Sequence, residues 1–224
     1  MKVSAILLLA GLSTRFDSPK SKQVCLLNGK PVFAYPLDTL SKNKQISNLV
    51  VVVNKKIKAE IEDYINKNNI SAKVVLGGKT RQESVEAGLA ICDGDIVVIH
   101  DGARPLIDDI IINEVVESAH ICGASTAYIP ETDTVTKINK DGCVDEFLDR
   151  NVIAKIQTPQ AFKFDLIKEA HERATNKDAT DDATLVKALG HEIKLVLGSK
   201  KLTKVTTIED IKYLEGLLKW TNIK

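Results

Sequence analysis

The sequence predicts an α/β fold with a doubly wound, mostly parallel sheet. Short apolar runs rich in Val, Ile and Leu recur from residue 3 to residue 129. These runs are continuous rather than alternating, which is typical of strands buried on both faces. The segments between them place apolar residues three and four positions apart, as surface helices do. Strand and helix in regular alternation indicate a parallel sheet with helices on both faces.

The predicted elements follow in order along the chain. Five apolar runs are expected to form strands: residues 3–9, 49–53, 73–76, 96–100 and 126–129. Four amphipathic segments are expected to form helices: residues 32–41, 56–68, 82–91 and 107–120. Residues 131–156 alternate around a turn at 139–142, which predicts a β-hairpin arm that projects from the sheet. The remainder is expected to add helices at 164–173 and 182–189, a strand at 194–197 and a C-terminal helix from 207 to about 220.

Length and charge limit the possible classes of function. The chain has 224 residues, which fits one domain over residues 1–224 that includes the arm. Its 31 basic and 30 acidic side chains give a net charge of +1, whereas a general nucleic-acid binder usually carries a clear basic excess. No apolar run approaches the ~18 residues of a membrane span, and the N-terminal run is better read as a buried strand than as a signal peptide. Four widely spaced cysteines without a C-x-x-C pair indicate reduced thiols, as in the cytoplasm, and no zinc site.

Functional residues are expected in the loops that follow the strands, because ligands of open parallel sheets bind beyond the carboxyl ends of the strands. The first loop combines small residues with Arg15, Lys20 and Lys22, and backbone N–H groups plus cations can hold a polyphosphate. A solvated basic loop would have the same composition. The dinucleotide fingerprint is absent because Gly11 is the loop's only glycine, and the P-loop is excluded because Lys73 stands where its first glycine is required.

Two later loops carry further candidates. In residues 77–85 the glycines can pass close to a ligand while Ser84 lies in the first turn of a helix; the alternative is a flexible turn capped by Thr80. Residues 100–105 place Asp101 and Arg104 at a strand end. Asp101 could hold a divalent metal on a phosphate or accept sugar hydroxyls, and the alternative is an Asp–Arg structural pair.

Together these loops resemble one family, 2-C-methyl-D-erythritol 4-phosphate cytidylyltransferase. Six blocks match in order between about Ala10 and Asp210: A-G-x-x-x-R with a downstream K-Q, G-G-x-x-R-x-x-S-V-x-x-G-L, H-D-x-A-R-P, D-T-V, D-R-N with Q-T-P-Q-x-F, and T-D-D with K-V-T-x-x-E-D. The resemblance implies a Rossmann-like nucleotidyltransferase fold with a projecting arm. It also implies transfer of CMP from CTP to the phosphate of methylerythritol phosphate, with Mg²⁺ bound and pyrophosphate released, in isoprenoid precursor synthesis.

The resemblance further implies roles for individual residues. Catalysis is assigned to Arg15, Lys22, Arg150 and Lys204. CTP binding is assigned to Ala10, Gly11, Gly78, Arg81, Ser84 and Asp101, the last also as a Mg²⁺ ligand. Binding of the second substrate is assigned to Arg104, Thr134, Thr158 and Thr180. In that family the arm clasps a second subunit, so a homodimer with sites completed by both chains is expected, with no nucleic-acid or membrane partner.

Five positions depart from the family pattern: Ser13, Ser21, Lys79, Thr136 and Leu202. The last three lie toward the base or the second substrate, so the acceptor could be ribitol 5-phosphate or another polyol phosphate. An inactive nucleotide-binding or interaction module is a third possibility, which loss of the site's cations would indicate. All six cations expected in a single cleft are retained: Arg15, Lys22, Arg81, Arg104, Arg150 and Lys204.

Overall fold

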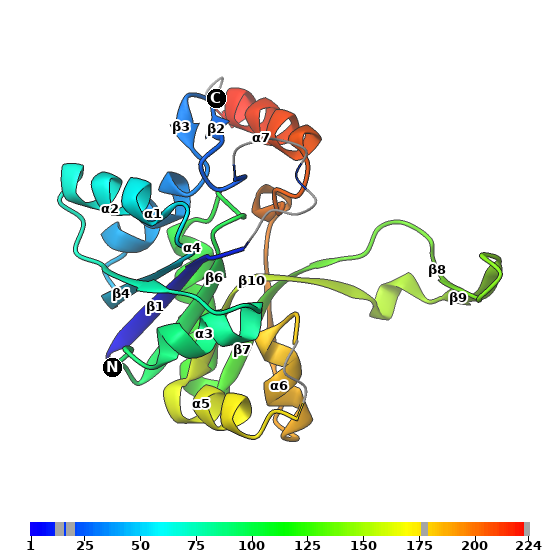
Figure 1. Cartoon of the computed structure of the whole chain (residues 1–224). Helices are drawn as coiled ribbons and strands as arrows, with labels where there is room; N and C mark the ends of the chain where they lie inside the picture. Colours follow the sequence, from blue (N-terminus) through cyan, green and yellow to red (C-terminus); the bar gives the residue numbers. More distant parts are fainter. Residues whose placement is uncertain (12–15, 17–20, 176–178, 222–224) are drawn as a thin grey trace.

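A seven-stranded sheet forms the centre of the molecule (Figure 1). The computed structural model describes residues 1–11, 16, 21–175 and 179–221. In spatial order the strands are β11 (Lys194–Leu197), β7 (Ala124–Pro130), β10 (Ala154–Lys163), β6 (Ile96–Asp101), β1 (Val3–Leu9), β4 (Ile46–Val53) and β5 (Lys73–Leu76). All of them run parallel except β10, which is antiparallel to both β6 and β7. The predicted mostly parallel sheet is therefore confirmed.

Strand β10 is the largest element that the sequence prediction missed. Its segment contains Gln157, Pro159 and Gln160, and polar residues around a proline argue against a central strand. The register between β10 and β7 shifts between Ile156 and Gln160, so Pro159 lies in an irregularity of the ladder. The buried amide N–H groups find partners outside the ladder: Gln157 donates to the Ser199 carbonyl, and Gln160 donates to Asp181.

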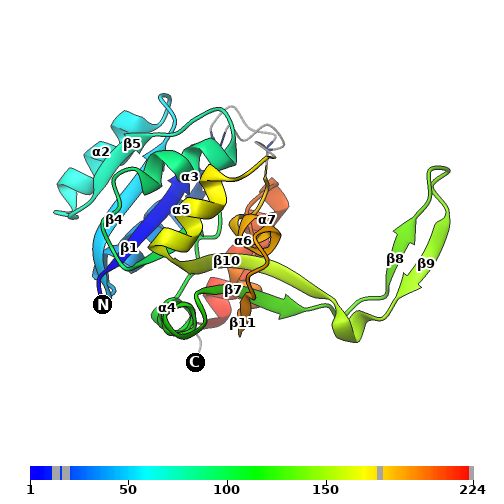
Figure 2. The same cartoon turned by 90° about the horizontal axis from the view of Figure 1, so that it is seen from below.

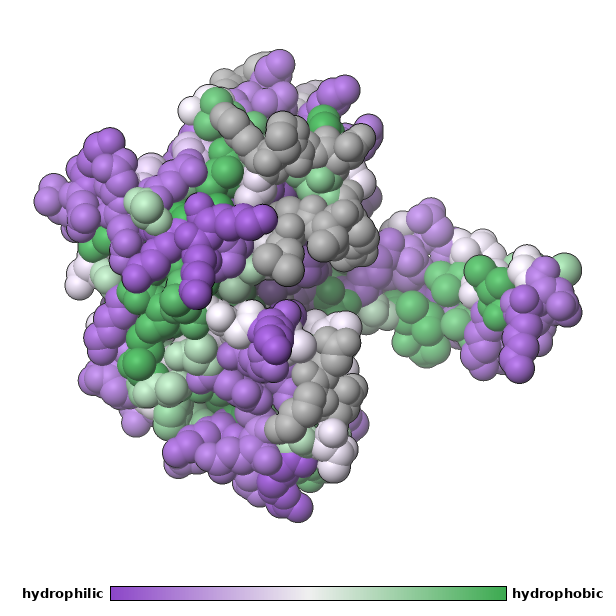
Figure 3. All heavy atoms as spheres, viewed as in Figure 1, coloured by the Kyte–Doolittle hydropathy of each residue, from purple (hydrophilic) through white to green (hydrophobic). Residues whose placement is uncertain are grey.

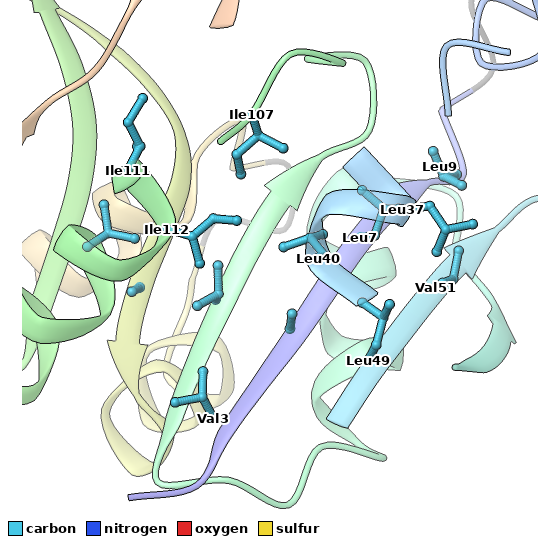
Figure 4. Packing of buried hydrophobic residues seen from close by; sticks show 14 of the residues in the cluster. Val3, Leu7, Leu9, Leu37, Leu40, Leu49, Val51, Ile107, Ile111 and Ile112 are labelled. Atoms are coloured by element: carbon cyan, nitrogen blue, oxygen red, sulfur yellow. The ribbon is translucent and has the colours of Figure 1, made fainter. Parts of the chain in front are cut away.

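Helices cover both faces of the sheet, as predicted. One face carries α1 (Ala34–Lys42), α2 (Lys58–Lys67) and α4 (Asp109–Cys122). The other carries α3 (Arg81–Leu89), α5 (Phe164–Glu172) and α6 (Asp182–Ala188). Successive residues of the central strands enter opposite cores: Leu7 packs with the first set of helices, where Figure 4 shows it near Leu37 and Leu40, and Ile6 packs with the second. Each face therefore buries its own apolar cluster.

Three smaller features complete the fold. The short sheet of β2 (Leu26–Leu27) and β3 (Lys30–Pro31), which was not predicted, shares a satellite core with α7 (Ile208–Thr221). The antiparallel hairpin of β8 (Val135–Ile138) and β9 (Val144–Leu148) projects far from the sheet (Figure 2). Two 3₁₀ turns are present: η1 (Arg150–Val152) precedes β10, and η2 (Lys200–Leu202) precedes α7. In the part of the chain that the structure describes, no helix is long and apolar enough to cross a membrane.

Candidate active site

A cleft of about 490 Å³ opens at the carboxyl ends of the central strands. From β1 the chain moves outward through β4 to β5 and then returns to β6 on the other side of β1. The strand order therefore reverses between β1 and β6, and such a switch point is where open α/β sheets bind ligands. Ala10 follows β1 and Asp101 ends β6, which places the cleft at this switch point. The described residues that line it are Leu8, Ala10, Gly11, Phe16, Lys22, Gln23, Asn54, Gly78, Lys79, Thr80, Arg81, Ser84, Asp101, Ala103, Lys204 and Thr206.

Backbone carbonyls of the first loop are fixed by two amide side chains. Asn54 Nδ2 donates to the Ala10 carbonyl at 3.3 Å, and Gln23 Nε2 donates to the Gly11 carbonyl at 3.0 Å. Because these carbonyls are anchored, the segment keeps a defined course along the cleft. Sequence reasoning missed Asn54, although a polar residue directly after a buried parallel strand was a usable signal.

The loop before α3 lies close to the first loop because it contains a glycine pair. A Cβ on Gly77 would lie 2.6 Å from both the Ala10 Cβ and the Ser84 Oγ. Thr80 caps α3 by accepting from the Glu83 N–H at 3.1 Å, which confirms the capping alternative without removing this loop from the cleft. The start of α3 therefore faces the cleft with its positive dipole end, an arrangement that favours bound anions.

Asp101 joins two cations from distant parts of the chain. Its Oδ1 lies 3.3 Å from Arg81 Nε, and its Oδ2 lies 2.6 Å from Lys204 Nζ. Burial raises the pKa of Asp101, but the charges of Arg81 and Lys204 outweigh that effect and hold the pKa well below its usual range. Arg104 forms no ion pair with Asp101; its Nη1 donates to the Leu202 carbonyl at 2.6 Å. The anticipated Asp–Arg pair therefore exists, but with Arg81 as the partner.

A chain of buried hydrogen bonds through His100 and Thr158 holds the loop that begins at Asp101. His100 Nε2 donates to the Arg104 carbonyl at 2.9 Å, so Nδ1 accepts from the Thr158 hydroxyl at 3.1 Å. The same hydroxyl oxygen accepts from the Asp101 N–H at 3.1 Å. Burial lowers the pKa of His100 to about 4, which keeps the ring neutral. Thr158 is buried with its hydroxyl used internally, so the structure does not bring it to the substrate side as expected.

The six expected cations do not gather in one cleft of a single chain. Lys22, Arg81 and Lys204 line it, and Lys79 joins them. Arg104 lies beneath the lining with its guanidinium turned toward η2. Arg150 and Thr134 are exposed on the arm, where Arg150 Nη1 donates to the Thr132 carbonyl, and Thr180 is exposed before α6. Arg15 and Lys20 lie outside the described residues.

The expected Mg²⁺ site rests on one carboxylate. Among the described lining residues Asp101 is the only acid, against four cations. The described part of the chain holds no cluster of three or more His, Cys, Asp or Glu suited to a metal. A single carboxylate fits Mg²⁺, which proteins commonly bind through one or two carboxylates together with substrate phosphates.

Comparisons with known proteins identify the family of this chain. A family model described as 2-C-methyl-D-erythritol 4-phosphate cytidylyltransferase matches residues 3–219. A relative of that name from Clostridium novyi (strain NT) is 40% identical over 229 residues, which cover 100% of this chain and 98% of the relative. A crystal structure of 4-diphosphocytidyl-2C-methyl-D-erythritol synthase from Anaerococcus prevotii DSM 20548 superimposes with a TM-score of 0.88 at 30% identity, covering 97% of this chain and 96% of that one.

A second solved structure supports the same relationship. The 2-C-methyl-D-erythritol 4-phosphate cytidylyltransferase of Thermus thermophilus superimposes with a TM-score of 0.81 at 28% identity, covering 98% of this chain and 100% of that one. The fold, the cleft at the switch point and the sequence matches over nearly the whole length point to one conclusion. The chain belongs to the 2-C-methyl-D-erythritol 4-phosphate cytidylyltransferase family and is a nucleotidyltransferase.

Proposed function

We propose that this chain transfers CMP from CTP to 2-C-methyl-D-erythritol 4-phosphate and releases pyrophosphate, a step of isoprenoid precursor synthesis. The chain belongs to a cytidylyltransferase family, and the observation that carries the proposal is the positive charge of its cleft. As far as the structure describes it, the lining contains one carboxylate, Asp101, and four cations: Lys22, Lys79, Arg81 and Lys204. Such an excess of positive charge suits a triphosphate and a second phosphate together. The retained cations argue against an inactive binding module.

The reaction needs positioning and charge stabilisation rather than a covalent enzyme intermediate. A phosphate oxygen of the acceptor forms a bond to the α-phosphorus of CTP, and the bond from that phosphorus to the oxygen bridging to the β-phosphate breaks, so pyrophosphate leaves with the electron pair. Negative charge grows at the α-phosphorus and on the leaving group. Lys22, which lines the cleft, is proposed to stabilise that charge. Arg15 is proposed for the same task from sequence resemblance alone.

The nucleotide is proposed to lie along the two glycine-containing loops. Ala10 and Gly11 offer a fixed backbone, and Gly78, Arg81 and Ser84 lie at the start of α3. Asp101 is proposed to hold Mg²⁺ together with phosphate oxygens. When bound, the ion would neutralise phosphate charge. Asp101 already orients Arg81, so the carboxylate serves the nucleotide site in both ways, and its Oδ2 orients Lys204 for the second substrate.

The second substrate is proposed to meet residues of both subunits. Lys204 lies at the cleft of one chain with Arg104 beside η2, whereas Thr134 and Arg150 lie on the arm. The arm exposes apolar side chains, visible as green atoms in Figure 3, including Phe147 with 68% and Val152 with 78% exposure. Exposed apolar groups on a projecting hairpin are suited to covering by a partner. We therefore propose a homodimer through the arm, residues 131–156 of a single domain over residues 1–224.

The acceptor can be settled by one assay. Pyrophosphate release from CTP is measured with methylerythritol phosphate and with ribitol 5-phosphate in parallel, at equal concentrations and with Mg²⁺. Efficient release with methylerythritol phosphate alone supports the proposal. Release with ribitol phosphate alone would contradict the acceptor, and release with neither would contradict the reaction. The four cysteines are all free, which is compatible with function in the reducing cytoplasm.

A further inference from the structure

The Arg81 guanidinium is held between two carboxylates on different elements. Its Nε lies 3.3 Å from Asp101 Oδ1, and its Nη1 lies 2.7 Å from Asp182 Oδ2. Burial lowers the pKa of Arg81, but the charges of Asp182 and Asp101 outweigh it and raise the pKa above the ordinary value. The Nε contact with Asp101 is a hydrogen bond, and the Nη1 contact with Asp182 is an ion pair, so two opposite charges on different elements restrict where the guanidinium lies. Arg81 also lines the cleft, so its orientation decides what a nucleotide meets there.

Asp182 is the more buried of these two carboxylates and does not line the cleft. Its side chain is only 1% exposed, and it occupies the first position of α6. The preceding residue, Asp181, caps that helix by accepting from the Ala183 N–H at 2.9 Å. A buried carboxylate with one partner could still turn about its own side chain, and leaving one of its oxygens unpaired would be costly.

His171 supplies that second partner. This residue of α5 is 3% exposed, and its Nε2 lies 3.1 Å from Asp182 Oδ1. A carboxylate can only accept, so Nε2 carries the proton. Nδ1 has no hydrogen-bond partner among the residues that the structure describes, and the acid facing it, Glu86, lies 3.6 Å away. The hydrogen bond that this ring donates is therefore directed at Asp182.

From this arrangement we propose that His171 is a positioning residue: through Asp182 it fixes the Arg81 guanidinium for nucleotide binding. The inference rests on the proposed function for the identity of the nucleotide. His171 itself lines a separate cavity of about 420 Å³ between α3 and α5, with Phe164 and Lys168, and not the cleft. The hydrogen bond from His171 to Asp182, and the ion pair from Asp182 to Arg81, form the proposed connection to the nucleotide site.

The test compares three variants that separate hydrogen bonding from packing. His171→Leu removes the donor with little change of volume, whereas His171→Gln keeps an N–H group close to the position of Nε2. Ile167→Ala is the matched control, because Ile167 is fully buried one turn earlier in α5 and, being apolar, cannot bond to Asp182. Melting temperatures of all three are measured so that kinetic effects can be compared at similar stability.

We expect His171→Leu to raise the KM for CTP about tenfold, with the acceptor KM within about twofold of the original. His171→Gln should restore the KM for CTP, and Ile167→Ala should leave it unchanged. Adding His171→Leu to Arg81→Gln should have no further effect on that KM, because the two residues act in series. Equal KM values in His171→Leu and Ile167→Ala, or no restoration by Gln, would overturn the proposal.

A nucleotide-free measurement separates this inference from the proposed function. The Nε–H resonance of Arg81 is assigned in ¹⁵N-labelled protein by its loss in Arg81→Lys. It should shift in His171→Leu, return in His171→Gln and remain in place in Ile167→Ala. If the original chain releases no pyrophosphate from CTP, the proposed function fails, yet this resonance still decides the positioning. An unmoved resonance in His171→Leu would overturn it even in a fully active enzyme.

Discussion

Lys204 and Asp101 lie 103 residues apart in the sequence, yet Lys204 Nζ donates to Asp101 Oδ2 at 2.6 Å. The contact is held by the backbone, because the Val205 N–H donates to the Ala103 carbonyl at 2.7 Å. The C-terminal segment after η2 is thereby pinned against the loop that follows β6. Part of the cleft lining is consequently formed by Lys204 and Thr206, which precede the C-terminal helix α7.

Replacing Lys204 should impair the second substrate more than CTP. Lys204→Ala removes a cation from the acceptor side of the cleft, so we expect the KM for the acceptor to rise about tenfold or more, and the KM for CTP to change less. Steady-state kinetics with each substrate varied in turn give both values. Lys201→Ala, at an exposed position of η2, is the control. Unchanged acceptor KM and kcat in Lys204→Ala would refute the assignment.

Lys22→Ala tests stabilisation of the transition state. Removing a charge expected to act mainly on the developing phosphate charge should lower kcat about 10²- to 10³-fold, with a smaller change in the KM for CTP. The matched control is Lys67→Ala, since Lys67 forms an exposed ion pair with Asp63 that contributes little. Turnover of Lys22→Ala close to that of the control would show that Lys22 has no catalytic role.

His100 should make stability fall at mildly acidic pH. Its folded pKa, about 4, lies below the ordinary value of 6.5 because of burial, so between these values the unfolded chain binds a proton that the folded chain does not. The contribution is complete above about pH 6.5 and is lost as pH falls through 4, a change of about 3 kcal/mol. Urea unfolding from pH 7.5 to 4 measures it. His100→Gln should remove this part of the slope, and equal slopes in both proteins would contradict the prediction.

Gly77→Ala should disturb the cleft without a large change in the core. The added Cβ would lie 2.6 Å from the Ala10 Cβ and from the Ser84 Oγ, so the two cleft loops must separate. We expect a rise of about tenfold in the dissociation constant for CTP, measured by calorimetry. Gly216→Ala in α7 is the control, because nothing lies within 4 Å of its added Cβ. Equal affinities in the two variants would show that the close approach is unimportant.

Mixing two variants, both assayed at an acceptor concentration low enough that each alone is nearly inactive, tests whether the arm completes the partner's site. In a heterodimer of Arg150→Ala and Lys204→Ala chains, one site would lack both residues and the other would keep both. Random exchange of subunits should therefore restore about a quarter of the original activity. Phe147→Asp, on the exposed face of the arm, should prevent this recovery and yield monomers in sedimentation. No recovery from two variants that do form mixed dimers would place Arg150 and Lys204 in the same chain's site.

The regular part of the fold was predictable because its signals are local. Each predicted helix forms with ends within two residues of the observed ones, since apolar spacing sets a helix face directly. Strand β10 was not predictable in the same way. Gln157 and Gln160 are tolerated in the sheet only because Ser199 and Asp181 meet them, and those partners come from segments far along the chain.

The candidate site was predictable to a similar degree. Gly78 and Arg81 stand in contiguous motifs that pattern reasoning can find, and both line the cleft. Asn54 stands alone after its strand, and the contact of Asp182 with Arg81 depends on how α6 packs near α3. Resemblance to the family motif predicts Thr158 beside the substrate, whereas the direction of its hydroxyl is set by His100 on the neighbouring strand.

Strand β10 begins beside the hairpin at Ala154 and continues to Lys163 between β6 and β7. The arm is therefore continuous with a strand of the central sheet, which pairs with β7 at Ala154–Ile156 and with both β6 and β7 at Gln160–Phe162. Thr158, near the middle of β10, accepts a hydrogen bond from the Asp101 N–H. A displacement of the hairpin would therefore act on the same strand that supports the loop of Asp101.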